Sequence, residues 1–347
     1  ILICCNLNKH KLFLDKKGFE SFHIGFDRKN INFLFEIKVI LKIFFIYKKI
    51  RPDIVHHVAA KPIIYGSLAA RLNNIKSVIN APVGLGYVFS SSSIKAKLLK
   101  PLVKLLYKIF LNRHKGMDKK NKVVFENYDD LNYFSSIGAL DPKDACVIRG
   151  AGVKIKYKLI NQKVQNKIPV ITFLARMLKD KGVYEFVEAV NKLKYNNIEG
   201  RFLLAGDVDP LNPSSVEIND LKNWHNEGNV EWLGWVNNVD QLLKKTDIVC
   251  LPSYREGLPK ALLEGAAHGL PIVTTDAVGC KDVVLEGING FLVPIKNSEK
   301  LYEALKKLIQ NKKLRIKMGK ESLKIVSEKF ESSKIILQTL NLYKEME

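Results

Sequence analysis

The chain has few cysteines for its 347 residues, and their spacing argues against two classes of protein. The five cysteines are scattered and form no Cys-x-x-Cys pair, so the sequence supports neither a disulfide framework nor a zinc site. It also lacks an uncharged apolar run of the roughly 18 to 20 residues that a membrane-spanning helix needs. Lys42 interrupts the longest such run, residues 39–47. These absences predict a protein of a reducing, cytoplasmic compartment.

Acidic residues are scarce relative to basic ones: 35 Asp and Glu against 56 Lys and Arg give a net charge of +21. Most of the excess lies in residues 1–150, which hold 26 basic and 11 acidic residues, a net +15. Such a field attracts polyanions, so charge alone permits both nucleic acid and anionic lipid as partners. No nucleic-acid module is evident, and aromatic residues do not alternate with the basic ones. We therefore expect no nucleic-acid partner, and a nucleic-acid-binding protein is the less favoured alternative.

Apolar strand-like segments and helix-like segments alternate along the chain, within a globular composition of 47% apolar and 26% charged residues. Such alternation predicts the α/β class, with parallel sheets covered by helices on both faces. One series occupies residues 1–153 and a second occupies residues 168–329. Residues 154–167 are polar, basic and aperiodic, which predicts a linker, and residues 330–347 predict a last helix. The sequence thus predicts two doubly wound domains.

The most informative segment is 252–271, PSYREGLPKALLEGAAHGLP. An apolar run before it predicts a buried strand, and Pro259 suits the first turn of a following helix. Glu256 then lies in the connecting loop and Glu264 on the helix. Free backbone amides at such a junction face an anion or sugar oxygens, while the carboxylates accept hydrogen bonds from hydroxyl groups. This pattern favours a nucleotide-sugar site. The alternative is that Glu256 is a solvated acid of the loop and Glu264 a charge on the surface of the helix.

Two glutamates separated by seven residues resemble the motif of the retaining glycosyltransferases of family 4, which have the two-domain GT-B fold. More narrowly, residues 206–213 (GDVDPLNP), 50–72 and 78–91 resemble the subgroup that builds on undecaprenyl-diphosphate-linked sugars in capsule, O-antigen and lipopolysaccharide biosynthesis. The resemblance implies transfer of a hexose or N-acetylhexosamine from a UDP-sugar to a polyprenyl-diphosphate-linked saccharide. It also implies an enzyme held peripherally on the inner face of the plasma membrane.

The same resemblance implies a role for each residue of the central segment. Glu256 would contact the transferred sugar, and Glu264 would hold the ribose hydroxyls. Gly257 and Leu258 would bind sugar and phosphate through their backbone amides. The expected division is therefore one glutamate for the sugar and one for the nucleoside.

Positive charge for the diphosphate is expected from Arg176 and Lys181, which follow another predicted strand and match basic positions of the family. The alternative for Lys179 and Lys181 is a solvated turn. Asp207 and Asp209 have the spacing of an Asp-x-Asp metal site, but we interpret them as turn residues because the basic pair already supplies the charge. We therefore expect no metal and no other cofactor.

Two further segments are expected to hold the nucleoside. Gly206 would allow the backbone to approach the nucleotide closely. Leu233, Gly234, Trp235 and Val236 end a predicted strand where relatives pass the nucleobase, here uracil, over the backbone. Trp235 either stacks on the base or packs between helices, and the sequence does not separate the two.

On the acceptor side, Gly84 and Gly86 are expected to form a loop that enters the cleft between the domains. Val83 stands where many family members have a histidine, so that contact cannot be assigned. His56 and His57 end a predicted strand that points at the cleft. Successive strand residues face opposite sides, so at most one of them can line the cleft, and a role in the core is equally compatible.

The predicted helix 94–112 is basic and amphipathic. Its lysines recur at spacings of three and four, with leucines across much of the remainder: Lys97, Lys100, Lys104 and Lys108. Together with the +15 charge of residues 1–150, this favours a helix that lies on an anionic membrane surface. The alternative is an ordinary domain helix with a solvated lysine stripe.

The start of the chain departs from the family pattern. Ile1 opens directly on ILICC, which has neither the basic leader nor the cleavage site of a signal peptide. Relatives begin with a strand, a glycine-containing loop and a helix, and ILICC corresponds to their second strand. The alternative to an active enzyme is therefore a truncated, non-catalytic, membrane-associated remnant.

Overall fold

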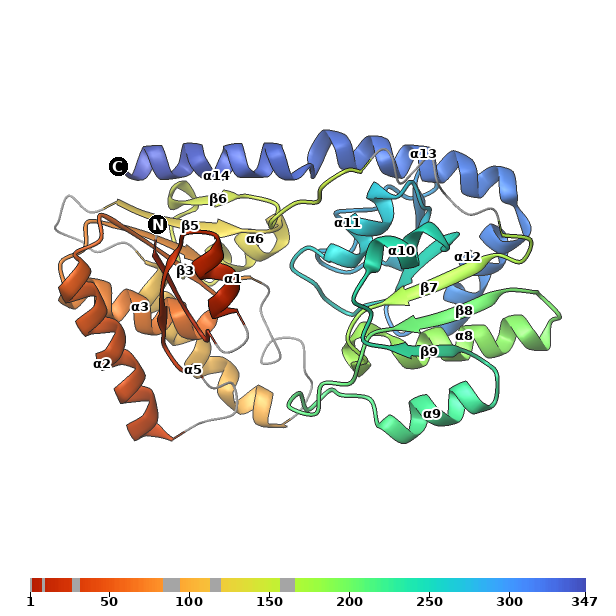
Figure 1. Ribbon diagram of the computed structural model, residues 1–347, viewed down its shortest axis with the longest axis horizontal. Helices are drawn as coiled ribbons and strands as arrows, with labels where there is room; N and C mark the ends of the chain where they lie inside the picture. Colours follow the sequence, from red (N-terminus) through yellow and green to blue (C-terminus); the bar gives the residue numbers. More distant parts are fainter. Residues whose placement is uncertain (1, 8–9, 27–31, 84–93, 113–119, 157–165) are drawn as a thin grey trace.

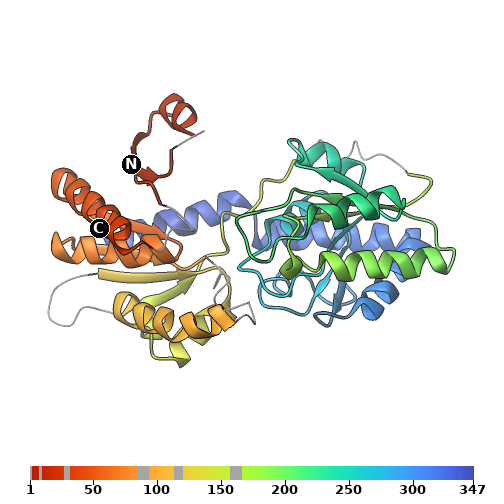
Figure 2. The same ribbon diagram turned by 90° about the horizontal axis from the view of Figure 1, so that it is seen from below.

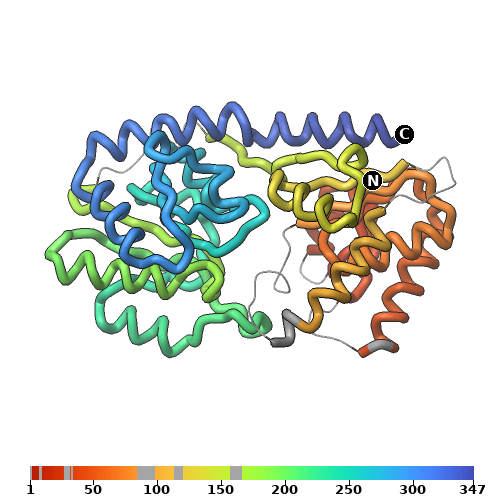
Figure 3. The backbone as a smooth tube through the Cα atoms, turned by 180° about the vertical axis from the view of Figure 1, so that it is seen from behind, coloured from red at the N-terminus to blue at the C-terminus, as the bar shows by residue number. Residues whose placement is uncertain are grey.

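In a computed structural model, the structure describes residues 2–7, 10–26, 32–83, 94–112, 120–156 and 166–347. The described chain forms two α/β units that lie side by side along the long axis of the molecule (Figure 1). The last two helices, α13 (Lys312–Lys329) and α14 (Ser332–Met346), run along the same side of both units (Figures 1 and 3). The predicted α/β class is confirmed.

The first unit contains a four-stranded parallel sheet in the order β3-β4-β5-β6. Because its strands are parallel, each must be joined to the next by a connection that crosses a face of the sheet. The elements of this sheet and its helices are β3 (Ile54–Val58), α3 (Ala60–Leu72), β4 (Ser77–Ala81), α5 (Ile94–Leu111), β5 (Lys120–Phe125), α6 (Tyr128–Ser136), the 3-10 turn η1 (Pro142–Asp144) and β6 (Ala145–Val147).

The first residues of the chain form a separate sheet. β1 (Leu2–Cys5) and β2 (Glu20–His23) pair in parallel with each other, and α1 (Lys11–Lys16) connects them. Figure 2 shows these elements protruding from the rest of the first unit. α2 (Phe33–Ile50) leads from them to β3 and packs on α3. Among the described residues no pairing joins β1 or β2 to β3, so these two strands form a sheet apart from the four-stranded one.

The second unit is a single six-stranded parallel sheet in the order β12-β11-β10-β7-β8-β9. Its central strands are buried on both faces, as the apolar runs of their sequences predict. The elements are β7 (Val170–Leu174), the 3-10 turn η2 (Lys179–Lys181), α8 (Val183–Tyr195), β8 (Arg201–Ala205), α9 (Ile218–Asn226), β9 (Glu231–Gly234), α10 (Val239–Lys244), β10 (Ile248–Leu251), α11 (Lys260–Ala267), β11 (Ile272–Thr275), β12 (Gly290–Val293) and α12 (Ser298–Gln310).

The last helix attaches the end of the chain to the first unit. Ile335 and Met346 of α14 pack in one apolar cluster with Ile79 of β4 and Val124 of β5. The Ser77 hydroxyl donates to the Met346 carbonyl at 2.6 Å, which satisfies a carbonyl at the helix end. α14 therefore packs against the first sheet, although it follows the second in sequence. No described helix is long and apolar enough to cross a membrane.

Candidate active site

The second sheet reverses its direction of growth between β7 and β10. The chain adds β8 and β9 on one side of β7, and then returns to place β10 on the other side. In open parallel sheets, loops at such a switch point separate at the carboxyl ends of the strands and form a binding crevice. The loops that follow β7 and β10 carry Arg176, Lys181 and Glu256. Topology thus brings residues about 80 positions apart to one place.

Lys181 and Glu256 form an ion pair between Nζ and Oε1, and both side chains are mostly buried. The close approach of their loops depends on Gly182, which has a φ of +77°. A Cβ added there would lie 2.2 Å from the Pro252 carbonyl oxygen. Only glycine fits this position, because both the left-handed backbone and the contact exclude a side chain. The neighbouring amide of Tyr254 donates to the Asp180 carbonyl at 2.9 Å and fastens the two loops together.

The loop that holds Glu256 is also fixed from the other side. The amide of Glu256 donates to the Val278 carbonyl at 3.0 Å. A Cβ added to Gly279 would lie 2.5 Å from the carbonyl oxygens of both Glu256 and Gly257. The backbone of residues 256–258 is therefore held between η2 and the loop after β11, which leaves its amides in a fixed orientation.

Glu264 lies one turn into α11, which begins after Pro259 as the sequence predicts. Its carboxylate is 3.6 Å from the Lys260 ammonium, one turn earlier. Burial raises the pKa of Glu264, while Lys260 opposes that shift. The carboxylate is therefore half-shielded on the same side of the helix as a cation, an arrangement that can accept hydrogen bonds from a pair of hydroxyl groups.

Arg176 is held by an acidic residue of the next loop, since its Nη1 lies 2.5 Å from the Asp209 Oδ2. Asp207 accepts a hydrogen bond from the amide of Val208, as expected of a turn residue. Gly206, with a φ of +145°, lies so close to the end of β7 that an added Cβ would be 1.8 Å from the Ala175 carbonyl oxygen. Within the described residues, no group of three or more His, Cys, Asp or Glu is arranged to hold a metal ion.

The strand end expected to carry the nucleobase is open to solvent. Leu233 and Trp235 are exposed, the latter by 71%, and Gly234 has a φ of +61°. The Trp235 indole donates to the Asn237 side chain at 2.9 Å. The interpretation that Trp235 packs between helices is therefore wrong. Trp232 makes the inward contact instead, donating to the Gly206 carbonyl at 2.9 Å. Val236 is half-buried.

The two predicted histidines lie in packed surroundings. His57 is only 4% exposed; its Nδ1 donates to the Asn80 side chain at 2.8 Å, and its Nε2 accepts from the Tyr47 hydroxyl at 3.0 Å. His56 Nδ1 lies 2.9 Å from the Tyr343 hydroxyl of α14. This geometry favours the core role that the sequence left open over a contact with the acceptor.

Gly84 and Gly86, the other residues expected on the acceptor side, lie outside the described residues. The geometry of that loop therefore adds nothing to the site.

The sequence did not single out the turn between β5 and α6, which brings the first unit onto the donor loop. Asn127 Nδ2 donates to the Gly257 carbonyl at 2.9 Å, and Asp130 forms an ion pair with Arg255. Glu126 precedes them and lies beside Leu258. A polar FENYDD stretch directly after a buried strand was the available signal, because polar residues at carboxyl strand ends commonly reach a site.

A second surface of the first unit is apolar. Along α5, Leu98 is 74% exposed, and Leu102, Leu105 and Ile109 continue an exposed stripe at helical spacing. Lys108 is exposed beside it, whereas the Lys104 ammonium lies 5.5 Å from the centre of the Tyr133 ring. The exposed face of α5 is thus rich in leucine with a lysine at its edge, and is not the solvated lysine stripe of the alternative interpretation. Exposed apolar stripes of this kind mark interaction surfaces.

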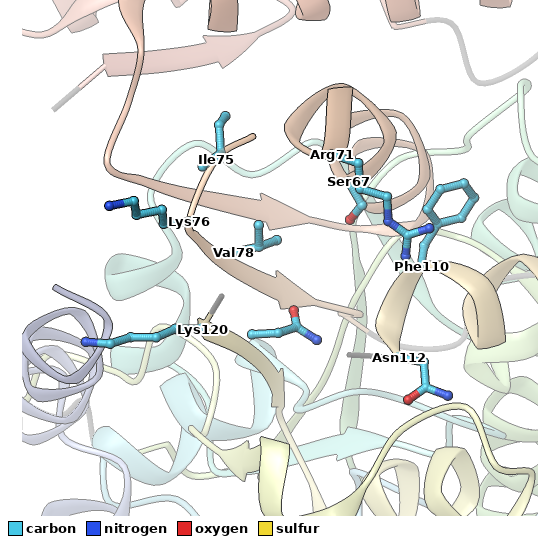
Figure 4. Close-up of a pocket in the computed structure, with 9 residues that line it drawn as sticks. Ser67, Arg71, Ile75, Lys76, Val78, Phe110, Asn112 and Lys120 are labelled. Carbon is cyan, nitrogen blue, oxygen red and sulfur yellow. The ribbon is translucent and has the colours of Figure 1, made fainter. Parts of the chain in front are cut away.

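The pocket in Figure 4 lies elsewhere in the first unit, at the amino ends of β4 and β5. Ligands of open parallel sheets bind at the opposite, carboxyl ends. We therefore do not include this pocket in the active site, although its lining is basic: Ser67, Arg71, Ile75, Lys76, Val78, Phe110, Asn112, Lys120 and Asn121.

Two α/β units, the second with a switch-point site, have close counterparts among solved structures. A glycosyltransferase from Rickettsia africae matches with a TM-score of 0.76 and 20% identity over 99% of this chain and 89% of that one. Anabaena HepE in complex with UDP and glucose matches with a TM-score of 0.77 and 16% identity over 99% and 91% of the two chains. The architecture is the GT-B fold of glycosyltransferases.

The sequence comparisons define the family. The model of the glycosyl transferases group 1 matches residues 157–324, and a glycosyl transferase 4-like model matches residues 1–114. A relative from Campylobacter jejuni, N,N'-diacetylbacillosaminyl-diphospho-undecaprenol alpha-1,3-N-acetylgalactosaminyltransferase, is 30% identical over 82% of this chain and 76% of its own length. Another from Escherichia coli, UDP-Gal:alpha-D-GlcNAc-diphosphoundecaprenol alpha-1,3-galactosyltransferase, is 27% identical over 92% and 82%. The chain belongs to the glycosyl transferases group 1 family and is a transferase enzyme.

Proposed function

We propose that the enzyme transfers a hexose or N-acetylhexosamine, with retention, from a UDP-sugar to a polyprenyl-diphosphate-linked saccharide. The observation that carries this proposal is the switch-point cluster of Lys181 and Glu256 beside the backbone amides of Gly257 and Leu258, in a loop whose position is fixed by the contacts of its neighbours. Support for the substrates comes from the Campylobacter and Escherichia relatives, whose names specify undecaprenyl-diphosphate-linked acceptors and, in the second, a UDP-sugar donor.

Each group of the site has a role in this reaction. The bond between the anomeric carbon and the diphosphate oxygen breaks, and an acceptor oxygen bonds to that carbon on the same face. The leaving diphosphate takes the acceptor proton, so the reaction needs no separate protein base. Arg176 would break its ion pair with Asp209, and Lys181 its ion pair with Glu256, so that both cations neutralise the diphosphate. Glu256 would then contact the sugar, and Glu264 would contact the ribose. No metal is part of this proposal, because the two cations supply the charge.

We also propose that the enzyme lies on the inner face of the plasma membrane through α5. The exposed leucines would enter the interface of the bilayer, and Lys108 would meet anionic headgroups. A lipid-linked acceptor lies at the same surface, so this placement would bring the first unit to its substrate. The basic charge of residues 1–150 supports the orientation.

The direct test uses the purified full chain. Calorimetry with UDP and GDP should detect binding of UDP alone. Incubation with lipid-linked acceptors should then give product from one of UDP-galactose, UDP-N-acetylgalactosamine, UDP-glucose or UDP-N-acetylglucosamine, with the α configuration of the donor preserved by NMR. Excess EDTA should leave the rate unchanged. Binding of another nucleotide in place of UDP, or tight binding of duplex DNA without transfer, would overturn the proposal.

A further inference from the structure

A third carboxyl group, Glu126, reaches the donor loop from the opposite unit. It follows the last residue of β5, where the parallel sheet of the first unit ends toward the second unit. A Cβ added to Gly150 would lie 3.2 Å from the Glu126 Oε1 and 3.7 Å from the Leu258 Cδ2, so the carboxyl group sits in a narrow space beside Leu258. The backbone amide of Leu258 lies near enough to lower the pKa of this carboxyl group, against the larger effect of burial.

Glu126 lies beside an amide that the proposed function assigns to the donor, that of Leu258. Its two acidic neighbours each have a cation: Asp130 pairs with Arg255 and Glu256 pairs with Lys181. No ion pair among the described residues includes Glu126. The charged groups that act on it are Asp130 of α6 and Glu256 of the loop after β10. The nearby cations are already paired: Arg255 with Asp130, Lys181 with Glu256, and Arg149 of the loop after β6 with Asp282.

The protonation of Glu126 responds to these surroundings. Burial, and then the charges of Asp130 and Glu256, raise its pKa to about 7, against a smaller opposing effect of the Leu258 amide. Glu126 therefore changes between its neutral and its ionised form within the physiological pH range, unlike an ordinary surface glutamate.

The turn that carries Glu126 is tied in place. Asn127, the next residue, is fully buried and bonds the Gly257 carbonyl, and Asp130 is bound to Arg255. Moving the backbone at Glu126 away from Leu258 would break both contacts. Protonation of the Glu126 carboxylate breaks neither of these contacts. It is therefore the less costly way for the site to accept an anion beside Glu126.

We propose that Glu126 is a donor-site residue supplied by the acceptor unit, and that it admits the anionic UDP-sugar in its neutral form and opposes it in its ionised form. The ionised carboxylate competes for the Leu258 amide and repels the diphosphate; the neutral carboxyl group does neither. This inference rests on the proposed function of the site.

The test is the pH dependence of donor affinity, measured by calorimetry with UDP-galactose and UDP-N-acetylgalactosamine, whose diphosphate diesters do not titrate between pH 6 and 8. For a group with a pKa of about 7, affinity should fall about tenfold from pH 6 to pH 8. Glu126→Gln should bind as tightly at pH 8 as the unmodified enzyme at pH 6, with no dependence on pH. Thermal unfolding checks that the variant is folded.

Asp129→Asn is the matched control, because Asp129 lies in the same turn but pairs with Lys281 at 3.2 Å. This variant should keep the pH dependence. If the unmodified enzyme binds a UDP-sugar equally well at both pH values, or Glu126→Gln keeps the fall, the inference is wrong while the proposed function stands. If the folded enzyme binds neither UDP-sugar at either pH, the proposed function fails and takes the inference with it.

Discussion

The two units of this glycosyltransferase differ in whether a single sheet and a single apolar core extend through the unit. The second has one six-stranded sheet and one apolar cluster that runs from Val153 to Phe330. The first has two separate sheets, and its buried residues fall into several smaller clusters. A continuous core fixes the loops at its strand ends, so the second unit suits precise recognition of a nucleotide sugar. The first unit instead exposes a basic and apolar surface.

The two units also differ in how much the site depends on backbone contacts. In the second unit, Gly182 and Gly279 bring loops into contacts too close for any side chain. In the first, the groups that reach the site are side chains of one turn, Glu126, Asn127 and Asp130. Substitutions in the second unit should therefore alter chemistry and donor affinity, whereas substitutions in the first should alter regulation, stability and membrane binding.

The largest effect is expected from Glu256→Gln. If Glu256 contacts the transferred sugar most strongly in the transition state, its loss should lower kcat by about a hundredfold or more. UDP affinity should not fall, because UDP has no sugar to contact Glu256 and the change releases Lys181 from its ion pair. Steady-state transfer assays and UDP calorimetry measure the two quantities. A large loss of UDP affinity would contradict the role of Glu256 in sugar binding.

Glu264→Gln should act on the nucleoside. Loss of a charge-assisted hydrogen bond to ribose costs roughly 1.5 to 3 kcal/mol, which is about a 10- to 100-fold weaker affinity for UDP. The same loss should be found for the UDP-sugar, since both ligands contain the ribose. Lys260→Gln is the control, because it removes the partner of Glu264 but leaves the carboxylate. Equal effects of the two glutamate variants on UDP would refute the division of roles.

In the first unit, His57→Gln should change the pH dependence of stability. Burial lowers the pKa of His57 to about 4, so folding favours the neutral ring. Because the unfolded chain takes up the proton near pH 6.5, stability falls as the pH drops below that value, by roughly 2 kcal/mol between pH 8 and pH 5. Urea unfolding at both pH values should find this loss reduced in His57→Gln.

The smallest effect tests the membrane surface. Lys108→Gln on α5 should weaken binding to phosphatidylserine vesicles by about 1 kcal/mol, roughly fivefold, and leave binding to neutral vesicles unchanged. Lys320→Gln on α13 of the second unit is the matched control and should bind like the unmodified enzyme. Equal losses in both variants, measured by vesicle flotation, would mean that the attraction is a property of total charge and not of α5.

Local patterns allowed the sequence to predict much of this protein. The helices α2, α5, α8 and α11 and the six strands of the second sheet follow from apolar periodicity and from glycine or proline at their ends, all of which act over a few residues. The Glu256 and Glu264 motif is also local. The sequence of β2, ESFH, has no continuous apolar run and so gives no local signal for a strand.

Tertiary structure decided which residues meet. Pairing of Lys181 with Glu256 depends on the order of strands in the sheet, and the contact of Glu126 with the donor loop depends on how the two units face each other. Burial of His57 and exposure of Trp235 likewise depend on neighbours distant in sequence. Local spacing determines the elements because their hydrogen bonds are short-range, whereas a site built from two units is determined only when both are packed together.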